Sequence, residues 1–194
     1  MNESITPIFS EYLYQKKLNI NIKSNSFIHK TKLTNDYKYI LNKPELKKLK
    51  ELLTAEVNYF TNKYLHYDNP FVITTSWLVK IKKDETNSYH YHNHKNSFLS
   101  GILYLNNDNF GGTQFCNFNQ KSFYVIPNQW NCFNSETYDT GYEKNKLVLF
   151  PSYLPHQIIP HKSKKTRLSI AFNVFPTGKV GEGDSTLTLG KYEF

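Results

Sequence analysis

The sequence predicts a mainly β protein, a strand-rich sandwich or barrel with a helix packed on its outside. Many short runs of β-branched and aromatic residues follow one another after residue 70, and turn residues separate them. One segment before them has helical spacing. With 15 Tyr, 14 Phe and 2 Trp, a chain of 194 residues has the side chains for a real core. Its length suits a single domain over residues 1–194.

The first elements are expected in residues 5–40, where short apolar runs indicate irregular strands. A helix is expected next, from about residue 44 to 65. Asn42 is placed to cap it, Pro44 suits its first turn, and Glu45 favours the positive end of the helix dipole. The apolar residues of this helix recur every three or four positions: Leu46, Leu49, Leu53, Val57, Phe60 and Tyr64.

After residue 70 the pattern changes to strands. The segments rich in β-branched and aromatic residues, each bounded by turn residues, are 71–82, 97–105, 120–126, 146–150, 156–160 and 167–175. Residues 176–186 contain several glycines and are predicted to form a loop. The last eight residues are predicted as an edge strand or a loose tail.

The composition argues against several classes of protein. No stretch approaches the ~18 apolar residues of a membrane span, and the N-terminus lacks the pattern of a secretory signal. Cys116 and Cys132 alone cannot form a disulfide framework or an all-cysteine zinc site, so a reduced, cytoplasmic protein is expected. The formal net charge is +8, but the lysines are scattered, and a nucleic-acid partner is not expected.

Three of the seven histidines lie close together, at His90, His92 and His94. In an extended segment alternate side chains point the same way, so these imidazoles would share one face. Crowded imidazoles are costly when protonated, but neutral imidazole binds iron, zinc, copper and nickel. The alternative is a polar turn that binds nothing. The spacing favours a metal site.

A fourth histidine, His156, follows a strongly apolar strand, and the only arginine of the chain, Arg167, comes shortly after it. The segment between them is predicted as a hairpin loop centred near Lys162, which would make His156 and Arg167 neighbours on adjacent strands. A guanidinium group is planar and binds a carboxylate through two parallel hydrogen bonds, which lysine cannot do.

These groups together suit one kind of chemistry. Non-haem iron(II) is held on one face by three side chains, which leaves positions open. A 2-oxo acid can chelate the ion through two of these positions, dioxygen can take the last, and a fixed cation can hold the far carboxylate. In such sites the metal and cosubstrate carry the chemistry, while the protein positions them.

At these positions the chain resembles a known family. The blocks HNHKNSFLSGILYLN, NFGGTQF, LVLFPSYLPHQIIPH and TRLSIAFNVF are similar to those of the 2-oxoglutarate/Fe(II)-dependent oxygenases, and more narrowly to a small group related to prolyl hydroxylases. The resemblance covers about residues 70–176. It implies a double-stranded β-helix, the jelly-roll core shared with cupins. It also implies a dioxygenase that uses Fe(II), 2-oxoglutarate and O2 to hydroxylate a substrate, with release of succinate and CO2.

The resemblance implies roles for particular residues. His92 matches the first metal ligand and His156 the distal one, whereas His94 stands where the wider superfamily has Asp or Glu. His90 has the same spacing from His92 and is an alternative ligand, although the motif aligns best with His94. The residues that match the cosubstrate site are Arg167 as the carboxylate anchor, Ser169, Tyr104 and Asn173.

The substrate is less well indicated. Trp77, Tyr89 and Tyr91 are candidates to line its pocket, and the alternative for Trp77 is a place in the core. A small molecule or a peptide is compatible with this core, because the fold does not fix the substrate. Three other functions stay open. One is a cupin-like metal protein or three-histidine enzyme that does not use 2-oxoglutarate, another is a jelly-roll binding module without activity, and the third is a basic nucleic-acid-binding domain whose histidines are incidental.

Overall fold

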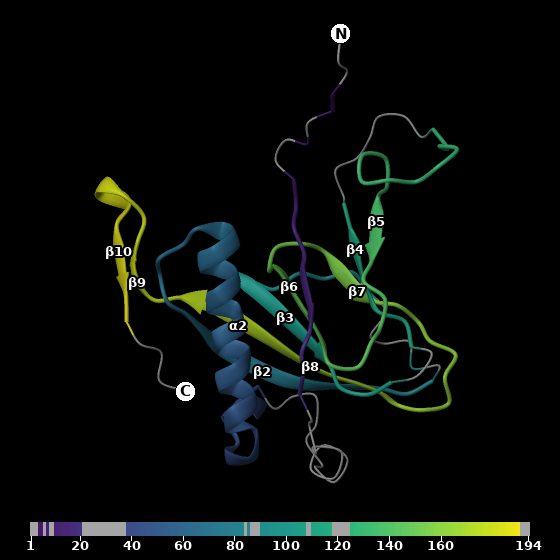
Figure 1. Cartoon of the computed structure of the whole chain (residues 1–194), viewed down its shortest axis with the longest axis horizontal. Helices are drawn as coiled ribbons and strands as arrows, with labels where there is room; N and C mark the ends of the chain where they lie inside the picture. The colour runs from purple at the N-terminus through teal and green to yellow at the C-terminus, as the bar shows by residue number, and fades with distance from the viewer. Residues whose placement is uncertain are drawn as a thin grey trace.

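The computed structural model describes residues 4–5, 7, 10–20, 38–83, 85, 90–107, 110–117 and 125–190. These residues form the mainly β architecture that the sequence predicts, with two main antiparallel sheets and one long helix outside them (Figure 1). Among the described residues, no helix is long and apolar enough to cross a membrane.

The larger sheet has five strands in the order β1-β6-β3-β8-β2, and every neighbouring pair is antiparallel. The strands are β1 (Tyr14–Lys17), β6 (Lys146–Pro151), β3 (Leu99–Tyr104), β8 (Arg167–Pro176) and β2 (Phe71–Ile81). β3 is buried along its whole length. Because both of its faces are covered, its residues do not alternate between buried and exposed positions.

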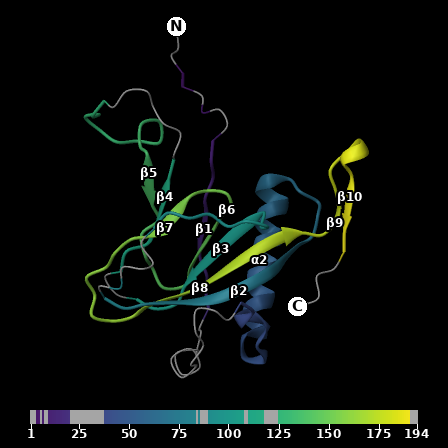
Figure 2. The same ribbon diagram turned by 180° about the vertical axis from the view of Figure 1, so that it is seen from behind.

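The smaller sheet has the order β5-β4-β7 and lies across from the larger one (Figure 2). Its strands are β5 (Thr137–Asp139), β4 (Thr113–Cys116) and β7 (His156–Ile158). An isolated antiparallel bridge between His92 and His156 adds one more pairing to β7.

Alternate residues of β6 separate two apolar clusters. Leu147 and Leu149 belong to the main core between the larger sheet and the helix, whereas Val148 and Phe150 belong to a second cluster that includes Phe115 of the smaller sheet. Successive side chains of a strand point to opposite faces. One face of the larger sheet therefore binds the helix, and the other faces the smaller sheet.

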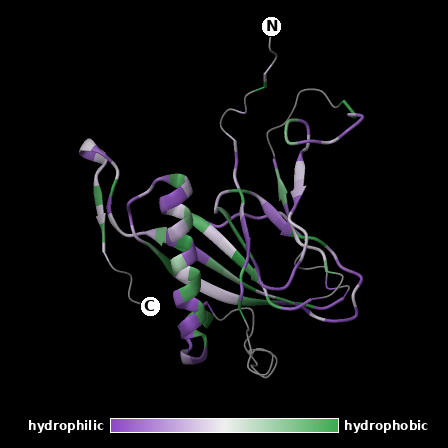
Figure 3. Cartoon of the chain, viewed as in Figure 1, coloured by the Kyte–Doolittle hydropathy of each residue, from purple (hydrophilic) through white to green (hydrophobic). Residues whose placement is uncertain are grey.

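The predicted helix is present, as a 3-10 turn η2 (Pro44–Leu46) that leads into α2 (Lys47–Leu65). A second 3-10 turn, η1 (Ile40–Asn42), precedes it. On α2, Leu53, Val57 and Phe60 are buried against the larger sheet, and apolar segments alternate with polar ones along its surface (Figure 3).

Two details of the predicted helix are wrong. Asn42 does not cap it: the N-cap of α2 is Leu46, without a side-chain bond, and Oδ1 of Asn42 instead accepts a hydrogen bond from Nζ of Lys50 at 2.6 Å. The reason is that the chain makes its first turn as a 3-10 turn, which moves the start of α2 away from Asn42. Tyr64, predicted on the apolar face, is exposed.

The hairpin predicted between His156 and Arg167 is also wrong. β7 pairs with β4 in the smaller sheet, whereas β8 pairs with β2 and β3 in the larger one. The chain crosses from one sheet to the other between these two residues. Their side chains therefore line the same space between the sheets and are not neighbours along a shared ladder.

The C-terminal part has more structure than expected. The predicted loop 176–186 contains β9 (Gly178–Val180) and η4 (Gly183–Ser185). β9 pairs with β10 (Leu187–Leu189), which lies in the segment predicted as an edge strand or a loose tail, and this hairpin stands apart from the two main sheets (Figure 1). The strand predicted at 120–126 lies mostly outside the described residues, and residues 125–126 are not in a strand.

Candidate metal centre

Backbone pairing places His92 beside His156. The His92 N–H donates to the His156 carbonyl at 3.0 Å, and the His156 N–H donates to the His92 carbonyl at 2.9 Å. Residues that exchange both bonds lie directly opposite each other, with their side chains on the same face. The two ring centroids are accordingly 4.5 Å apart.

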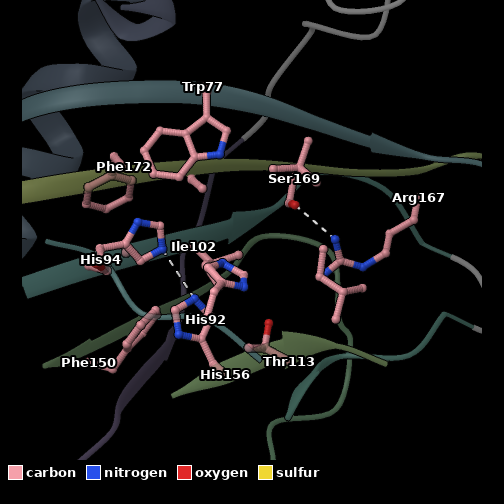
Figure 4. A pocket seen from close by; sticks show the side chains of 15 residues that line it. Trp77, His92, His94, Ile102, Thr113, Phe150, His156, Arg167, Ser169 and Phe172 are labelled. Atoms are coloured by element: carbon pink, nitrogen blue, oxygen red, sulfur yellow. Dashed lines mark hydrogen bonds between the residues drawn. The ribbon is translucent and has the colours of Figure 1, made fainter. Parts of the chain in front are cut away.

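His94 enters the same space from the segment that carries His92. Its backbone N–H donates to the Ser152 carbonyl at 2.9 Å, and its Nε2 lies 3.3 Å from Nε2 of His156 (Figure 4). One ring nitrogen from each of His92, His94 and His156 lies within 4.8 Å of the others. His90 is exposed and is not part of this cluster.

Hydrogen bonds fix the orientation of two of these rings. Nδ1 of His156 lies 2.9 Å from the Leu154 carbonyl, and Nδ1 of His92 lies 3.1 Å from the His90 carbonyl. A carbonyl only accepts, so each Nδ1 carries the hydrogen and each Nε2 keeps its lone pair for another partner.

Burial also keeps the imidazoles neutral. Burial is the main reason that the pKa of His156 is lowered to about 3 and that of His94 to about 4, and the neighbouring histidines contribute to both shifts. Neutral imidazole is the form that binds a metal. Two nitrogens on one ion at about 2.1 Å are roughly 3 Å apart, close to the separation of the His94 and His156 nitrogens. This donor set fits a divalent transition-metal ion.

Arg167 lies in the same region, at the first residue of β8, and is only 1% exposed. Its Nη1 donates to Oγ of Ser169 at 3.1 Å, and its Nε donates to the Gly111 carbonyl at 3.3 Å. The guanidinium carbon lies 5.3 Å from the ring centroid of Tyr104 and 5.0 Å from that of Tyr142. These contacts hold the cation in one orientation inside a buried site.

The three histidines and Arg167 line one pocket between the two sheets, with an empty volume of about 440 Å³ when the solvent at its opening is included. Figure 4 shows the imidazoles gathered on one side and the guanidinium on the other, with Thr113 below and Trp77 above. The pocket therefore combines a metal-binding donor set with a fixed cation, which is the arrangement that a chelating dicarboxylate needs.

Comparison with known proteins agrees with this geometry. A family model described as "Putative 2OG-Fe(II) oxygenase" matches residues 75–173, about half of the chain. The chain belongs to the 2OG-Fe(II) oxygenase family. The oxygenase is thus an oxidoreductase of a family named for Fe(II) and 2-oxoglutarate. No match is found among curated proteins.

Solved structures share the fold of this oxygenase at low sequence identity. HygX from Streptomyces hygroscopicus with iron bound has a TM-score of 0.57 at 14% identity, over 86% of this chain and 83% of that one. HygX with nickel, 2-oxoglutarate and hygromycin B has 0.57 at 12%, over 86% and 84%. A 2OG-Fe(II) oxygenase from Burkholderia pseudomallei has 0.51 at 13%, over 69% of this chain and 59% of that one. The fold is thus the predicted double-stranded β-helix.

Of the four predicted cosubstrate residues, two line the pocket and two lie behind its wall. Arg167 and Ser169 line the pocket, whereas Tyr104 and Asn173 do not. Tyr104 lies against the guanidinium of Arg167, and Asn173 accepts a hydrogen bond from Oγ of Ser100 at 3.1 Å. Asn173 was predicted because strand alternation puts it on the same face as Arg167. Alternation does not take into account that Asn173 lies toward the other end of β8.

Only one of the predicted substrate residues lines the pocket among those that the structure describes. Trp77 lines the pocket, and its ring centroid is 5.4 Å from that of His94. Tyr91 does not line it, because its hydroxyl donates to Oε1 of Gln114 at 2.5 Å. Tyr89 lies outside the described residues.

Sequence reasoning missed several lining residues. Thr113 and Ser100 contribute hydroxyl groups, and Val79, Ile158 and Ala171 contribute apolar surface. Strand alternation carries a partial signal, since Val79 is two residues from Trp77 and Ala171 two from Ser169. Nothing in the local sequence distinguishes this inner face from the face that binds α2.

Proposed function

We propose that this oxygenase hydroxylates a C–H bond of its substrate with Fe(II), 2-oxoglutarate and O2. In the balanced reaction, R–H, 2-oxoglutarate and O2 give R–OH, succinate and CO2. One oxygen atom of O2 enters the alcohol R–OH, and the other enters succinate. The observation that carries the proposal is the placement of the three imidazoles and the guanidinium of Arg167 in one pocket.

In this proposal His92, His94 and His156 hold the ion through Nε2. When bound, Fe(II) supplies O2 activation coupled to decarboxylation of the 2-oxo acid. The hydrogen bonds from Nδ1 of His92 and His156 to backbone carbonyls fix the tautomer and the ring orientation. His90, which is exposed, presents its carbonyl to His92 and has no ligand role.

Arg167 would bind the far carboxylate of 2-oxoglutarate, with the Ser169 hydroxyl beside it. Ser169 and the Gly111 carbonyl hold the guanidinium by hydrogen bonds, so little side-chain entropy is lost when the carboxylate binds. The apolar residues Val79, Ile158 and Ala171 line the same pocket. They would exclude water around the reacting groups.

The substrate would reach the metal near Trp77, whose indole lies beside His94 in the pocket wall. A small molecule or a peptide is compatible with this position. One structural relative, HygX, is described with hygromycin B bound, which supports a small-molecule substrate. In this proposal Trp77 is the residue that contacts it.

A second candidate is a three-histidine enzyme that does not use 2-oxoglutarate. The ligand cluster favours it, because His92, His94 and His156 include no carboxylate, whereas the common iron site of 2-oxo-acid oxygenases has two histidines and one carboxylate.

Succinate release separates the two candidates. Supplied with Fe(II), 2-oxoglutarate and O2, the wild-type protein should form succinate even without its substrate, and His156→Ala should not, since it removes a ligand. His66→Ala, which alters an exposed histidine at the end of α2, is the control and should match the wild type. Metal binding without any consumption of 2-oxoglutarate would support the second candidate instead.

A further inference from the structure

A chain of hydroxyl groups lies beside the segment that carries His94. Oγ of Ser152 is 2.8 Å from Oγ of Ser97 and 2.9 Å from Oγ of Ser100. Oγ of Ser100 is in turn 3.1 Å from Oδ1 of Asn173. Ser100 and Ser152 are buried. A buried hydroxyl costs free energy unless it is bonded, and the reaction proposed above uses none of these four groups.

This polar chain connects three separate strands to the metal-binding segment. Ser100 belongs to β3, Asn173 to β8, and Ser152 directly follows β6. The backbone of Ser152 binds the segment at two points, accepting from the His94 N–H at 2.9 Å and donating to the Phe98 carbonyl at 3.1 Å. A displacement of Ser152 would therefore displace His94.

Ser97 binds the C-terminal end of the segment that carries His94. Its Oγ lies 2.8 Å from the Leu99 carbonyl, 3.3 Å from the Val174 carbonyl and 3.3 Å from the Val174 N–H. The hydroxyl of Ser97 thus ties the turn after His94 to β8. Positive φ at Asn96 (54°) marks the sharp turn between His94 and Ser97.

His94 depends on such support more than the other two histidines. His92 and His156 exchange backbone hydrogen bonds, and each has its Nδ1 bonded to a carbonyl. Within the part of the chain that the structure describes, Nδ1 of His94 has no such bond. Its ring is positioned by a tilted contact with Trp77, by stacking on His156 and by the backbone. The position of its Nε2 is therefore set by how firmly Ser152 and Ser97 hold the segment.

We propose that Ser152, Ser100, Ser97 and Asn173 are positioning residues that hold His94 at the distance from His156 that a shared metal ion requires. This inference rests on the proposed three-histidine site. It gives Asn173 a role different from cosubstrate binding: it anchors the polar chain on β8. The groups act on the metal only through His94.

The test measures Co²⁺ affinity by the visible absorption of the bound ion, together with the thermal unfolding of the metal-free proteins. Ser152→Ala and Ser100→Ala should weaken Co²⁺ binding by about 10- to 100-fold, as loss of groups that orient a ligand typically does. Ser76→Ala is the matched control. It removes a serine hydroxyl of equal burial, bonded to the Leu41 N–H at 2.9 Å, on the helix-facing side of the larger sheet.

The outcomes are distinct. Weaker Co²⁺ binding in the first two variants but not in Ser76→Ala, at similar loss of unfolding temperature, supports the inference. Equal affinity in all the variants overturns it, and so does an equal loss in all of them, which would reflect general loosening. If Ser152→Ala does not fold, Ser97→Ala, at a half-buried position, takes its place with the same expectation. Failure of the wild type to bind Co²⁺ would contradict the metal site itself.

Discussion

At the scale of single residues, Arg167 is the most unusual choice in the chain. Among the fully buried side chains of the described residues, that of Arg167 has the largest volume. A buried charge is costly unless it is bonded, and here Ser169, the Gly111 carbonyl and two tyrosine rings surround it. Burial raises the pKa of one of them, Tyr142, to about 12, so its phenol stays neutral next to the cation.

The first residue-scale prediction concerns this guanidinium. In Arg167→Lys an ammonium group replaces the planar guanidinium group, and the bidentate contact with a carboxylate is lost. We expect 2-oxoglutarate to bind the Co²⁺-loaded variant about 10- to 100-fold more weakly, which corresponds to roughly 1.4–2.8 kcal/mol. Co²⁺ affinity itself should stay within about threefold. Titration calorimetry measures both constants, and equal 2-oxoglutarate affinity in variant and wild type would disprove the anchor role.

A second prediction separates the overlapping histidine pairs. His94→Ala should weaken Co²⁺ binding by at least about 10-fold, because it removes a nitrogen from the cluster. His90→Ala should leave it unchanged, since that side chain is exposed and contributes only its backbone carbonyl to His92. The two variants delete the same chemical group at positions four residues apart. A larger effect of His90→Ala would assign the ligand pair to His90 and His92.

At the scale of elements, the larger sheet depends on one close approach. An added Cβ at Gly101 on β3 would lie 2.1–2.7 Å from the ring of Phe172, which is paired with it on β8. Phe172 is fully buried in the main core and is held between the central strands. A glycine at this point therefore lets two central strands pack around the ring.

This contact gives an element-scale prediction. Gly101→Ala should lower the free energy of unfolding by about 1–3 kcal/mol or more, the usual cost of overpacking a well-filled core. Urea unfolding followed by circular dichroism measures the change. Gly190→Ala is the control, because a Cβ there meets nothing within 4 Å. Equal stability of the two variants would show that the ring of Phe172 relaxes freely.

At the scale of the whole molecule, the metal site joins distant parts of the chain. His92 and His94 come from the segment between β2 and β3, while His156 begins β7 in the smaller sheet. An ion bound to all three would connect these segments in the folded state only. Its binding free energy then adds to the stability of the fold.

The whole-molecule prediction is a rise in unfolding temperature on metal loading. At a Co²⁺ concentration about 100 times Kd, the folded state gains about 2.7 kcal/mol, which for a protein of this size corresponds to roughly 5–10 °C. Differential scanning calorimetry with and without a chelator measures it. His156→Ala should show no rise under the same conditions. A rise of the same size in that variant would mean that Co²⁺ binds elsewhere.

The sequence determined the kinds of element and the chemistry of the side chains. The three-and-four spacing over 44–65 gives α2, and the β-branched and aromatic runs give β2, β3, β6, β7 and β8. The short strands β4 and β5 of the smaller sheet were not predicted. The His-x-His tract, the later histidine and the single arginine pointed to the family that the comparison shows. These features are local, so periodicity and residue type are enough to reveal them.

Only the tertiary structure decided which segments meet. β7 and β8 are close in sequence but belong to different sheets, so His156 and Arg167 face each other across the pocket. The tertiary structure also brings His94, and not His90, into the histidine cluster, and it places Asn173 beside Ser100. Strand pairing depends on the burial of whole faces against distant partners, and a local pattern does not specify the partner.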